Sequence, residues 1–176
     1  PAWDARMAAV LIALYPRRGE WCIPLTLRPA HMVDHARQIS LPGGTHEADE
    51  TDEQCALREY EEELGAAASK LVTVGYLSPV YVFASNFYVT PCVAVAEQTP
   101  AFEPNPHEVE RVVELPLSVL LDPVCRETHI RSRRGFSFQT CHICCGDDRI
   151  WGATGMILSE AAQVIAESLE MPHVSG

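Results

Sequence analysis

Apolar residues in this chain recur in short runs of strand length. Residues 7–14 form a continuous apolar run, and residues 22–27 form a second one after a turn around Pro16 and Gly19. Residues 71–76 and 86–96 are rich in Val, Tyr and Phe, and residues 108–114 alternate apolar with charged residues, so each segment is predicted to be a strand. Residues 130–145 predict a hairpin that turns near Gly135.

Three segments have helical spacing instead. Residues 116–121 predict a short helix, and residues 153–169 have the apolar spacing of an amphipathic helix. A further helix is predicted between Thr51 and Gly65, because Thr51-x-x-Gln54 is a capping box and Gly65 can end a helix in the left-handed conformation. Strands interrupted by helices at these points predict an α/β fold, with a mixed β-sheet sandwiched between α-helices.

The helix that follows Thr51 has two different faces. Its apolar stripe, which can face a core, consists of Ala56, Leu57, Tyr60 and Leu64. Glu59, Glu62 and Glu63 stand at positions i, i+3 and i+4, so their carboxylates share another face. Three like charges repel each other unless they share a cation, and oxygen ligands of this kind suit Mg²⁺ or Mn²⁺. The alternative interpretation is a solvated acidic surface.

The loop before this helix favours a ligand site over a solvated surface. Pro42-Gly43-Gly44 permits a tight turn and a close approach of the backbone to a ligand or a metal. Arg58 lies within the acidic cluster and can bridge to Glu50, which would hold the loop against the helix. We therefore expect structural roles for Gly44, Glu50, Arg58 and Gly65.

Length, composition and charge restrict the class of protein. With 176 residues, 47% of them apolar, the chain is expected to form one domain over residues 1–176. No apolar run approaches the roughly 20 residues of a membrane-spanning helix, so we expect no membrane interaction. The net charge of −11 argues against a general nucleic-acid binder, because the phosphate backbone would be repelled. A small polyanionic substrate remains compatible, since a bound metal inverts the local charge.

The seven cysteines predict reduced thiols, because the N-terminus lacks the pattern of a secretory signal. We accordingly expect a cytoplasmic protein. The run Cys141-His142-Ile143-Cys144-Cys145 raises the alternative of a zinc site. It lacks a second ligand pair at a suitable spacing, and the alternation from Phe136 onward is typical of a strand, so we interpret it as a strand.

The spacing around the acidic helix is similar to that of a known motif. Gly44-x5-Glu50-x7-Arg58-Glu59-Tyr60-x-Glu62-Glu63-x-Gly65-Ala66 resembles the Nudix box, G-x5-E-x7-R-E-U-x-E-E-x-G-U, in which U is apolar. The resemblance implies the Nudix fold and a metal-dependent hydrolase that cleaves phosphoanhydrides in nucleoside diphosphate derivatives. It also implies that Glu59, Glu62, Glu63 and the backbone carbonyl of Gly43 bind Mg²⁺ or Mn²⁺. The expected partner is a small nucleoside diphosphate substrate, and a homodimer is a candidate assembly.

Residues before the box narrow the resemblance. Leu25-Thr26-Leu27-Arg28-Pro29 and residues 38–44 are similar to the signature of the coenzyme A pyrophosphatase branch, L-L-T-x-R-S-x3-R-x3-G-x3-F-P-G-G, with its spacing kept. Departures from that signature include Pro29 for Ser, Val33 for Arg, Arg37 for Gly and Leu41 for Phe. The resemblance implies that Arg28 faces a phosphate. Arg37 is a candidate substrate-binding residue that either supplies the missing phosphate contact or obstructs pantetheine.

Two further roles stay open. A water that attacks phosphorus needs a proton acceptor, and Glu62 or Glu63 could serve through the metal. Glu108 is the catalytic candidate outside the box, with Glu110 behind it, because a loop before a strand can deliver it to the site. Residues 126–134 contain four arginines in a chain with a single lysine. This basic patch is either a solvated hairpin or a clamp for a nucleotide phosphate.

Three functions are compatible with these residues. The first is hydrolysis of coenzyme A or an acyl-coenzyme A, and the second is the same chemistry on another substrate such as ADP-ribose or a dinucleotide. The third is a nucleotide-binding module without turnover, against which the complete set of Glu59, Glu62 and Glu63 argues.

Overall fold

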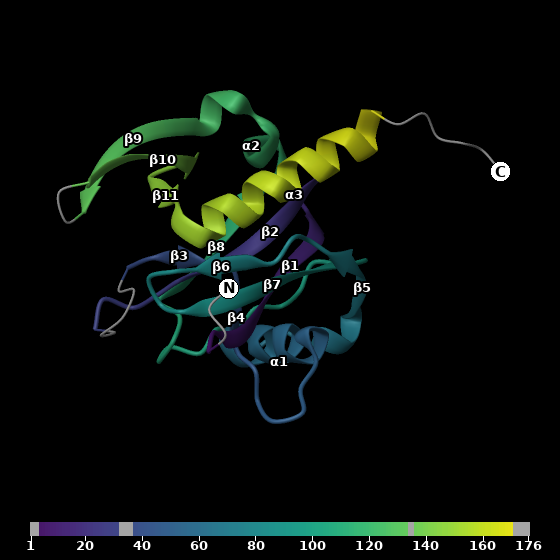
Figure 1. Ribbon diagram of the computed structural model, residues 1–176. Helices are drawn as coiled ribbons and strands as arrows, with labels where there is room; N and C mark the ends of the chain where they lie inside the picture. Colours follow the sequence, from purple (N-terminus) through teal and green to yellow (C-terminus); the bar gives the residue numbers. More distant parts are fainter. Residues whose placement is uncertain (1–3, 32–36, 134–135, 171–176) are drawn as a thin grey trace.

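A mixed β-sheet of eight strands forms the centre of the molecule (Figure 1). The computed structural model describes residues 4–31, 37–133 and 136–170. The main path of the sheet runs through β3 (Ile39–Ser40), β2 (Glu20–Leu27), β1 (Arg6–Arg17), β7 (Phe87–Ala96) and β5 (Leu71–Tyr76). Off this path, β4 (Gly43–Thr45) pairs with β1, β6 (Val80–Val82) with β7, and β8 (Arg111–Pro116) with β2. β1 and β7 are parallel, whereas β1 and β2 are antiparallel, so the sheet is mixed as predicted.

Helices cover both faces of this sheet. α1 (Asp52–Leu64) lies against one face, and α3 (Gly152–Glu170) lies on the other side together with the short α2 (Leu117–Leu121) (Figure 1). Leu11 packs in the buried cluster under α1, whereas its neighbour Ile12 packs in the cluster that contains Ile157 of α3. Successive side chains of a strand point to opposite faces, so a strand covered on both sides is apolar throughout. This explains the continuous apolar run of β1 and confirms the predicted sandwich.

A second, three-stranded antiparallel sheet lies beside α2 and α3 (Figure 1). It consists of β9 (Arg126–Arg133), β10 (Phe136–Cys145) and β11 (Asp148–Ile150). The hairpin predicted at residues 130–145 therefore begins earlier, at Arg126, and its turn near Gly135 lies outside the described residues. β11 was not predicted, because its three residues are too short to show a period and form a strand only through pairing with β10. Ile143 and Ile150 of this sheet belong to the same buried cluster as Ile157.

Several predicted boundaries change in the structure. β8 begins at Arg111 instead of residue 108, so Glu108 and Glu110 lie in the loop before it. β7 begins at Phe87, because Asn86 adopts a left-handed φ of 56° in the preceding turn. Two 3₁₀ turns, η1 (Ala68–Lys70) and η2 (Pro123–Cys125), complete the described elements. Within the described parts of the chain, no helix has both the length and the apolar character needed to cross a membrane.

Candidate active site

Thr51 and Gly65 cap the two ends of α1, as the sequence predicts. The Thr51 side chain accepts a hydrogen bond from the Gln54 backbone at 3.2 Å, and the Gln54 side chain accepts one from the Thr51 backbone at 3.0 Å. Gly65 ends the helix at φ 63°, where it donates to the Glu61 carbonyl. A Cβ at Gly65 would also overlap the carbonyl oxygen of Glu103. Glycine is therefore required both by the conformation and by the close approach of the next loop.

Arg58 joins α1 to the loop before it, as predicted. Its Nε and Nη2 donate to the two carboxylate oxygens of Glu50 at 2.8 and 3.0 Å, and Nη2 also donates to the Thr45 carbonyl at 3.1 Å. The hydrogen bond from Arg58 is the main cause that lowers the pKa of Glu50 to about 2. Nη1 of Arg58 donates to Glu59 at 2.8 Å and to Glu62 at 3.0 Å, which partly neutralises the acidic face.

The two glycines of the loop bring the backbone against these carboxylates. The carboxylate of Glu59 occupies the place that a Cβ on Gly44 would need. Gly43 faces Val10 in the antiparallel pair of β1 and β4, between the hydrogen bonds from Leu11 to Pro42 and from His46 to Met7. A residue between such bonds directs its own N–H and C=O away from the partner strand. The carbonyl of Gly43 therefore points to the outer edge of β4, where it can act as a ligand.

Glu63 is the most buried of the three box carboxylates, with 6% of its surface exposed. Its Oε2 has no hydrogen-bond partner among the described residues. Burial raises the pKa of Glu63 to about 8, with a further contribution from the charges of Glu59 and Glu108, while Arg28 opposes the shift. Burial likewise raises the pKa of Glu59, although Arg58 acts against it. The fold thus holds carboxylates together at a cost that a bound cation would remove.

A loop docked on the end of α1 brings Glu108 to the same place. The backbone N–H groups of Glu103 and Asn105 donate to the carbonyls of Leu64 and Glu63, each at 2.9 Å. Glu108 follows this anchor, and its charge contributes to the raised pKa values of both Glu59 and Glu63. The loop therefore places the charge of Glu108 near these two carboxylates, and the catalytic role of Glu108 stays a prediction. The anchoring role of Asn105 was not predicted, although Asn-Pro is a known signal for a turn.

Arg28 faces the carboxylates from the end of β2. Its charge acts on Glu63, and its buried Nε lacks a hydrogen-bond partner in the described part of the chain. Backbone hydrogen bonds to Gln38 at 3.0 Å and from Arg37 at 3.1 Å close the base of the loop that follows it. A half-buried arginine whose buried Nε is a free donor, beside a candidate metal site, is suited to a phosphate oxygen.

Arg37 differs from Arg28 in its surroundings. Its side chain is 65% exposed, and its Nη1 lies 3.8 Å from Glu110 Oε1. Its backbone has φ 57°, a left-handed conformation that glycine adopts without strain. The glycine of the branch signature would adopt this left-handed conformation without strain, whereas Arg37 adopts it at a cost. Val33, the other altered cation position, lies outside the described residues.

The donor set fits a hard divalent cation. Glu59, Glu62, Glu63 and the Gly43 carbonyl offer oxygen ligands, and the partnerless Oε2 of Glu63 is a buried acceptor ready for a cation. Across the residues that the structure describes, however, no three His, Cys, Asp or Glu side chains are already arranged to hold an ion. Arg58 contacts Glu59 and Glu62 instead, so the predicted sharing of one ion by the three carboxylates would require this contact to change.

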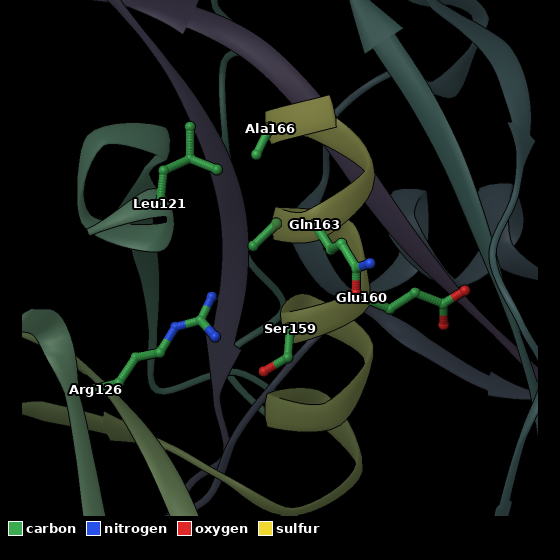
Figure 2. A pocket seen from close by; sticks show the side chains of 7 residues that line it. Leu121, Arg126, Ser159, Glu160, Gln163 and Ala166 are labelled. Carbon is green, nitrogen blue, oxygen red and sulfur yellow. The ribbon is translucent and has the colours of Figure 1, made fainter. Parts of the chain in front are cut away.

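Arg126, the arginine of the basic patch whose side chain the structure describes, lies away from the box carboxylates. Arg126 lines a cavity of about 550 Å³ together with Leu121 of α2 and Ser159 and Gln163 of α3 (Figure 2). α3 is on the opposite side of the sheet from α1, so Arg126 does not face the carboxylates (Figure 1). The side chains of Arg131 and Arg133, and all of Arg134, lie outside the description.

Comparison with known proteins agrees with this geometry. The profile of the NUDIX domain matches residues 5–134. The chain belongs to the Nudix family. It is 34% identical over 173 residues to the mitochondrial coenzyme A diphosphatase NUDT8 of Homo sapiens, covering 96% of this chain and 73% of that protein. It is also 34% identical over 173 residues to the mitochondrial Nudix hydrolase 15 of Arabidopsis thaliana, covering 92% of this chain and 59% of the plant protein. The chain thus spans less than two thirds of that relative.

The fold is likewise that of the family. The crystal structure of RenU, a Nudix hydrolase from M. smegmatis, superimposes with a TM-score of 0.63 at 17% identity, covering 94% of this chain and 89% of that one. The predicted Nudix fold is confirmed. As a Nudix pyrophosphohydrolase, the protein acts on small nucleoside diphosphate derivatives, and such hydrolases generally depend on divalent metals. The named human relative is a coenzyme A diphosphatase, which is consistent with the predicted resemblance to the coenzyme A pyrophosphatase branch. Because both named relatives are mitochondrial, the predicted cytoplasmic location is not confirmed.

Proposed function

We propose that this Nudix hydrolase cleaves the phosphoanhydride of coenzyme A or an acyl-coenzyme A, with water as the nucleophile. The observation that carries the proposal is the 34% identity with a coenzyme A diphosphatase over 96% of this chain. Arg28 supports it, because it stands at the arginine of the branch signature and keeps a free donor beside Glu63. We assign this arginine to a phosphate of the substrate.

We further propose that Glu59, Glu62, Glu63 and the carbonyl of Gly43 hold Mg²⁺ or Mn²⁺. When bound, such an ion neutralises phosphate oxygens and lowers the pKa of water. Glu50 keeps the Nε and Nη2 groups of Arg58 engaged, so only Nη1 of Arg58 contacts Glu59 and Glu62. These two contacts of Nη1 can be exchanged for a cation while Arg58 still holds the loop. Glu50, Arg58, Gly44 and Gly65 are accordingly structural in this proposal.

The general base is proposed to be Glu108, with Glu62 or Glu63 as the alternatives inside the box. Glu108 is exposed on a loop anchored to α1 and acts electrostatically on Glu59 and Glu63. Glu108→Gln should lower kcat about 10²–10⁴-fold, as expected for the loss of a general base. Glu103→Gln, an exposed glutamate on the same loop, is the control and should retain kcat. If Glu108→Gln keeps the kcat of the wild type across the pH range, the general base is Glu62 or Glu63 instead.

The substrate is tested by comparing kcat/KM for coenzyme A, ADP-ribose and diadenosine polyphosphates under one metal condition. Coenzyme A is expected to be preferred. If ADP-ribose exceeds coenzyme A by more than about tenfold, which corresponds to about 1.4 kcal/mol of transition-state preference, the coenzyme A proposal fails. Membership in the Nudix family would be unaffected by that result.

Arg37 gives a second test of the substrate. Its left-handed backbone and its exposed side chain mark the position where this chain departs from the branch signature. Arg37→Gly should improve coenzyme A turnover if the side chain obstructs pantetheine. It should weaken turnover if Arg37 provides the phosphate contact that Val33 lacks. Arg37→Ala removes the same side chain without supplying a glycine backbone, and therefore separates the side-chain effect from the backbone effect.

A further inference from the structure

The loop between β7 and β8 contains a turn whose hydrogen bonds converge on Asn105. The carbonyl of Asn105 accepts from the backbone N–H of Glu108 at 3.1 Å and from that of Val109 at 2.8 Å. Its side-chain Oδ1 accepts from the backbone N–H of His107 at 3.1 Å. Asn105 therefore binds the backbone N–H groups of the residues that follow Pro106, and Glu108 is the middle one.

This arrangement is a single turn of the helical type, capped by an asparagine side chain. A carbonyl that accepts from the residue four positions on closes one helical turn. An asparagine at the N-cap accepts, through its side chain, an N–H group that the turn itself leaves without an acceptor. Pro106 follows at the first position of the turn, where no N–H is needed and the φ of proline is already suitable. The dipeptide Asn-Pro thus determines where the turn begins.

Both ends of the turn are attached to elements of the candidate active site. At its start, the N–H of Asn105 donates to the carbonyl of Glu63, in the last turn of α1, at 2.9 Å. At its end, the N–H of Glu110 donates to the carbonyl of Leu27, at the end of β2, at 2.8 Å. Glu108 is exposed on the turn between these two attachments. The backbone therefore fixes where the turn lies, independently of the Asn105 side chain.

The Asn105 side chain controls the shape of the turn instead. Among the described residues, its Oδ1 is the acceptor of the His107 N–H. Without this acceptor, the peptide group between Pro106 and His107 can rotate towards solvent, and the direction of the next side chain, Glu108, changes with it. The side chain of Asn105 is thus placed to decide where the carboxylate of Glu108 points.

Electrostatic repulsion makes such a restraint necessary. Glu108 lies close enough to act electrostatically on both Glu59 and Glu63. Like charges at close range repel each other, so an exposed carboxylate on a loose turn would move away from the box. A capped turn opposes this movement.

We propose that Asn105 is a positioning residue for Glu108, whose side-chain amide holds the turn in the conformation that keeps the Glu108 carboxylate beside Glu59 and Glu63. This inference rests on the proposed role of Glu108 as the general base. Asn105 acts only through Glu108 and does not touch the reacting atoms. A displacement of about 1 Å can cost about 10²-fold in rate, so one hydrogen bond in this turn is enough to affect turnover.

Asn105→Ala tests the proposal, because it removes the acceptor and keeps the backbone bond to Glu63. With the fastest substrate of the panel at saturating Mg²⁺, kcat should fall by about 10–100-fold while KM stays unchanged. Amide hydrogen exchange at residues 107–109 should become faster. The affinity for Mn²⁺ without substrate should stay that of the wild type, because the box helix is unaltered. Glu103→Gln, an exposed glutamate on the same loop, is the control and should keep kcat.

Asn105→Ser tests whether the hydrogen bond is the cause. Serine is neutral and offers a weaker acceptor for the same N–H, so this variant should recover part of the kcat that Asn105→Ala loses. A serine variant no more active than the alanine variant would contradict the proposal.

The double variant separates positioning from a general disturbance of the site. In the Glu108→Gln background, Asn105→Ala should lower kcat no further, because the carboxylate that it positions is absent. An undiminished further loss, or weaker Mn²⁺ binding by Asn105→Ala, would mean that Asn105 acts through α1 and would overturn the proposal. Wild-type kcat of Asn105→Ala beside a reduced kcat of Glu108→Gln would overturn it and leave Glu108 as the base. Wild-type kcat of Glu108→Gln would remove the general-base assignment and this proposal with it.

Discussion

Glu63 is a box residue whose chemistry depends strongly on the fold. It stands on α1 between a buried face and an acidic one, and only 6% of its surface is exposed. Burial and the charges of Glu59 and Glu108 raise its pKa to about 8, so the charged form is disfavoured when no cation is bound. Glu62, one residue earlier, is 54% exposed and pairs with Arg58. Glu62 and Glu63 therefore differ in environment, and substituting the exposed Glu62 is expected to disturb the core less than substituting the buried Glu63.

Glu62→Gln is the substitution that tests the metal site with least disturbance of the fold. The substitution removes a ligand charge while keeping the shape of an exposed side chain. We therefore expect kcat to fall by about 10²-fold or more at saturating Mg²⁺, while the free energy of unfolding stays unchanged. Glu61→Gln is the matched control on the same helix, because it keeps the Oε1 that accepts from the Ala68 backbone at 2.7 Å. Near-normal turnover of Glu62→Gln would remove Glu62 from the site.

Glu50→Gln tests the ion pair with Arg58 through its pH dependence. The pKa of Glu50 is lowered from 4.5 to about 2 in the folded protein, so its contribution to stability is fully present above pH 4.5. This contribution is lost as the pH falls from about 4.5 towards 2. The variant should be less stable at pH 7, by on the order of 2 kcal/mol, and its difference from the wild type should shrink at pH 3. Urea unfolding at the two pH values measures both quantities, and a pH-independent difference would contradict the prediction.

At the scale of elements, the end of α1 and the Glu108 loop behave as one unit. Two backbone hydrogen bonds hold the loop to the last turn of the helix. The glycine at position 65 permits this approach, because any side chain there would meet the Glu103 carbonyl. The geometry of the catalytic candidates therefore depends on a residue that carries no functional group.

Gly65→Ala and Gly146→Ala separate backbone strain from this close approach. Both glycines have similar left-handed φ values, 63° and 59°, but a Cβ at Gly146 has open space around it. Each substitution should cost about 1–2 kcal/mol for the left-handed conformation. Gly65→Ala should cost about 1–3 kcal/mol more for the overlap and should lower kcat by displacing Glu108. Equal losses of stability and unchanged kcat would show that the loop approach is unimportant.

At the scale of the whole molecule, one buried cluster joins the main sheet to the C-terminal elements. Ile12 and Ile23 of the main sheet share it with Ile143 of β10 and Ile157 of α3. The single domain over residues 1–176 is still a prediction, as are the cytoplasmic location and the homodimer. The shared core supports the single domain, because a separate domain would bury its own apolar residues.

Cooperative unfolding tests this prediction. Trp21 lies in β2 and Trp151 lies between β11 and α3, so fluorescence reports both regions. Urea transitions followed by tryptophan fluorescence and by far-UV circular dichroism should coincide. Ile157→Ala, which truncates a side chain 2% exposed, should shift both transitions together by about 2–5 kcal/mol. A transition of the C-terminal elements that occurs separately from the main sheet would mean two domains.

The sequence by itself determined the features that depend on local order along the chain. The capping box at Thr51, the glycine end at Gly65 and the contact of Arg58 with Glu50 were all predicted from spacing, because they join residues of one helix and the loop before it. The long strands were also predicted, since a strand covered on both faces has a continuous apolar run. Their ends were less accurate, because pairing with other strands and single left-handed residues such as Asn86 decide where a strand begins.

The tertiary structure alone decided which distant groups meet. The short strands β4 and β11 exist only through their partners, and so no period in the sequence marks them. The approach of Arg28 and Glu108 to Glu63 depends on how β2 and the loop before β8 pack against α1. The raised pKa of Glu63 follows from the same packing, because burial and neighbouring charge are properties of the folded surroundings and not of the residue.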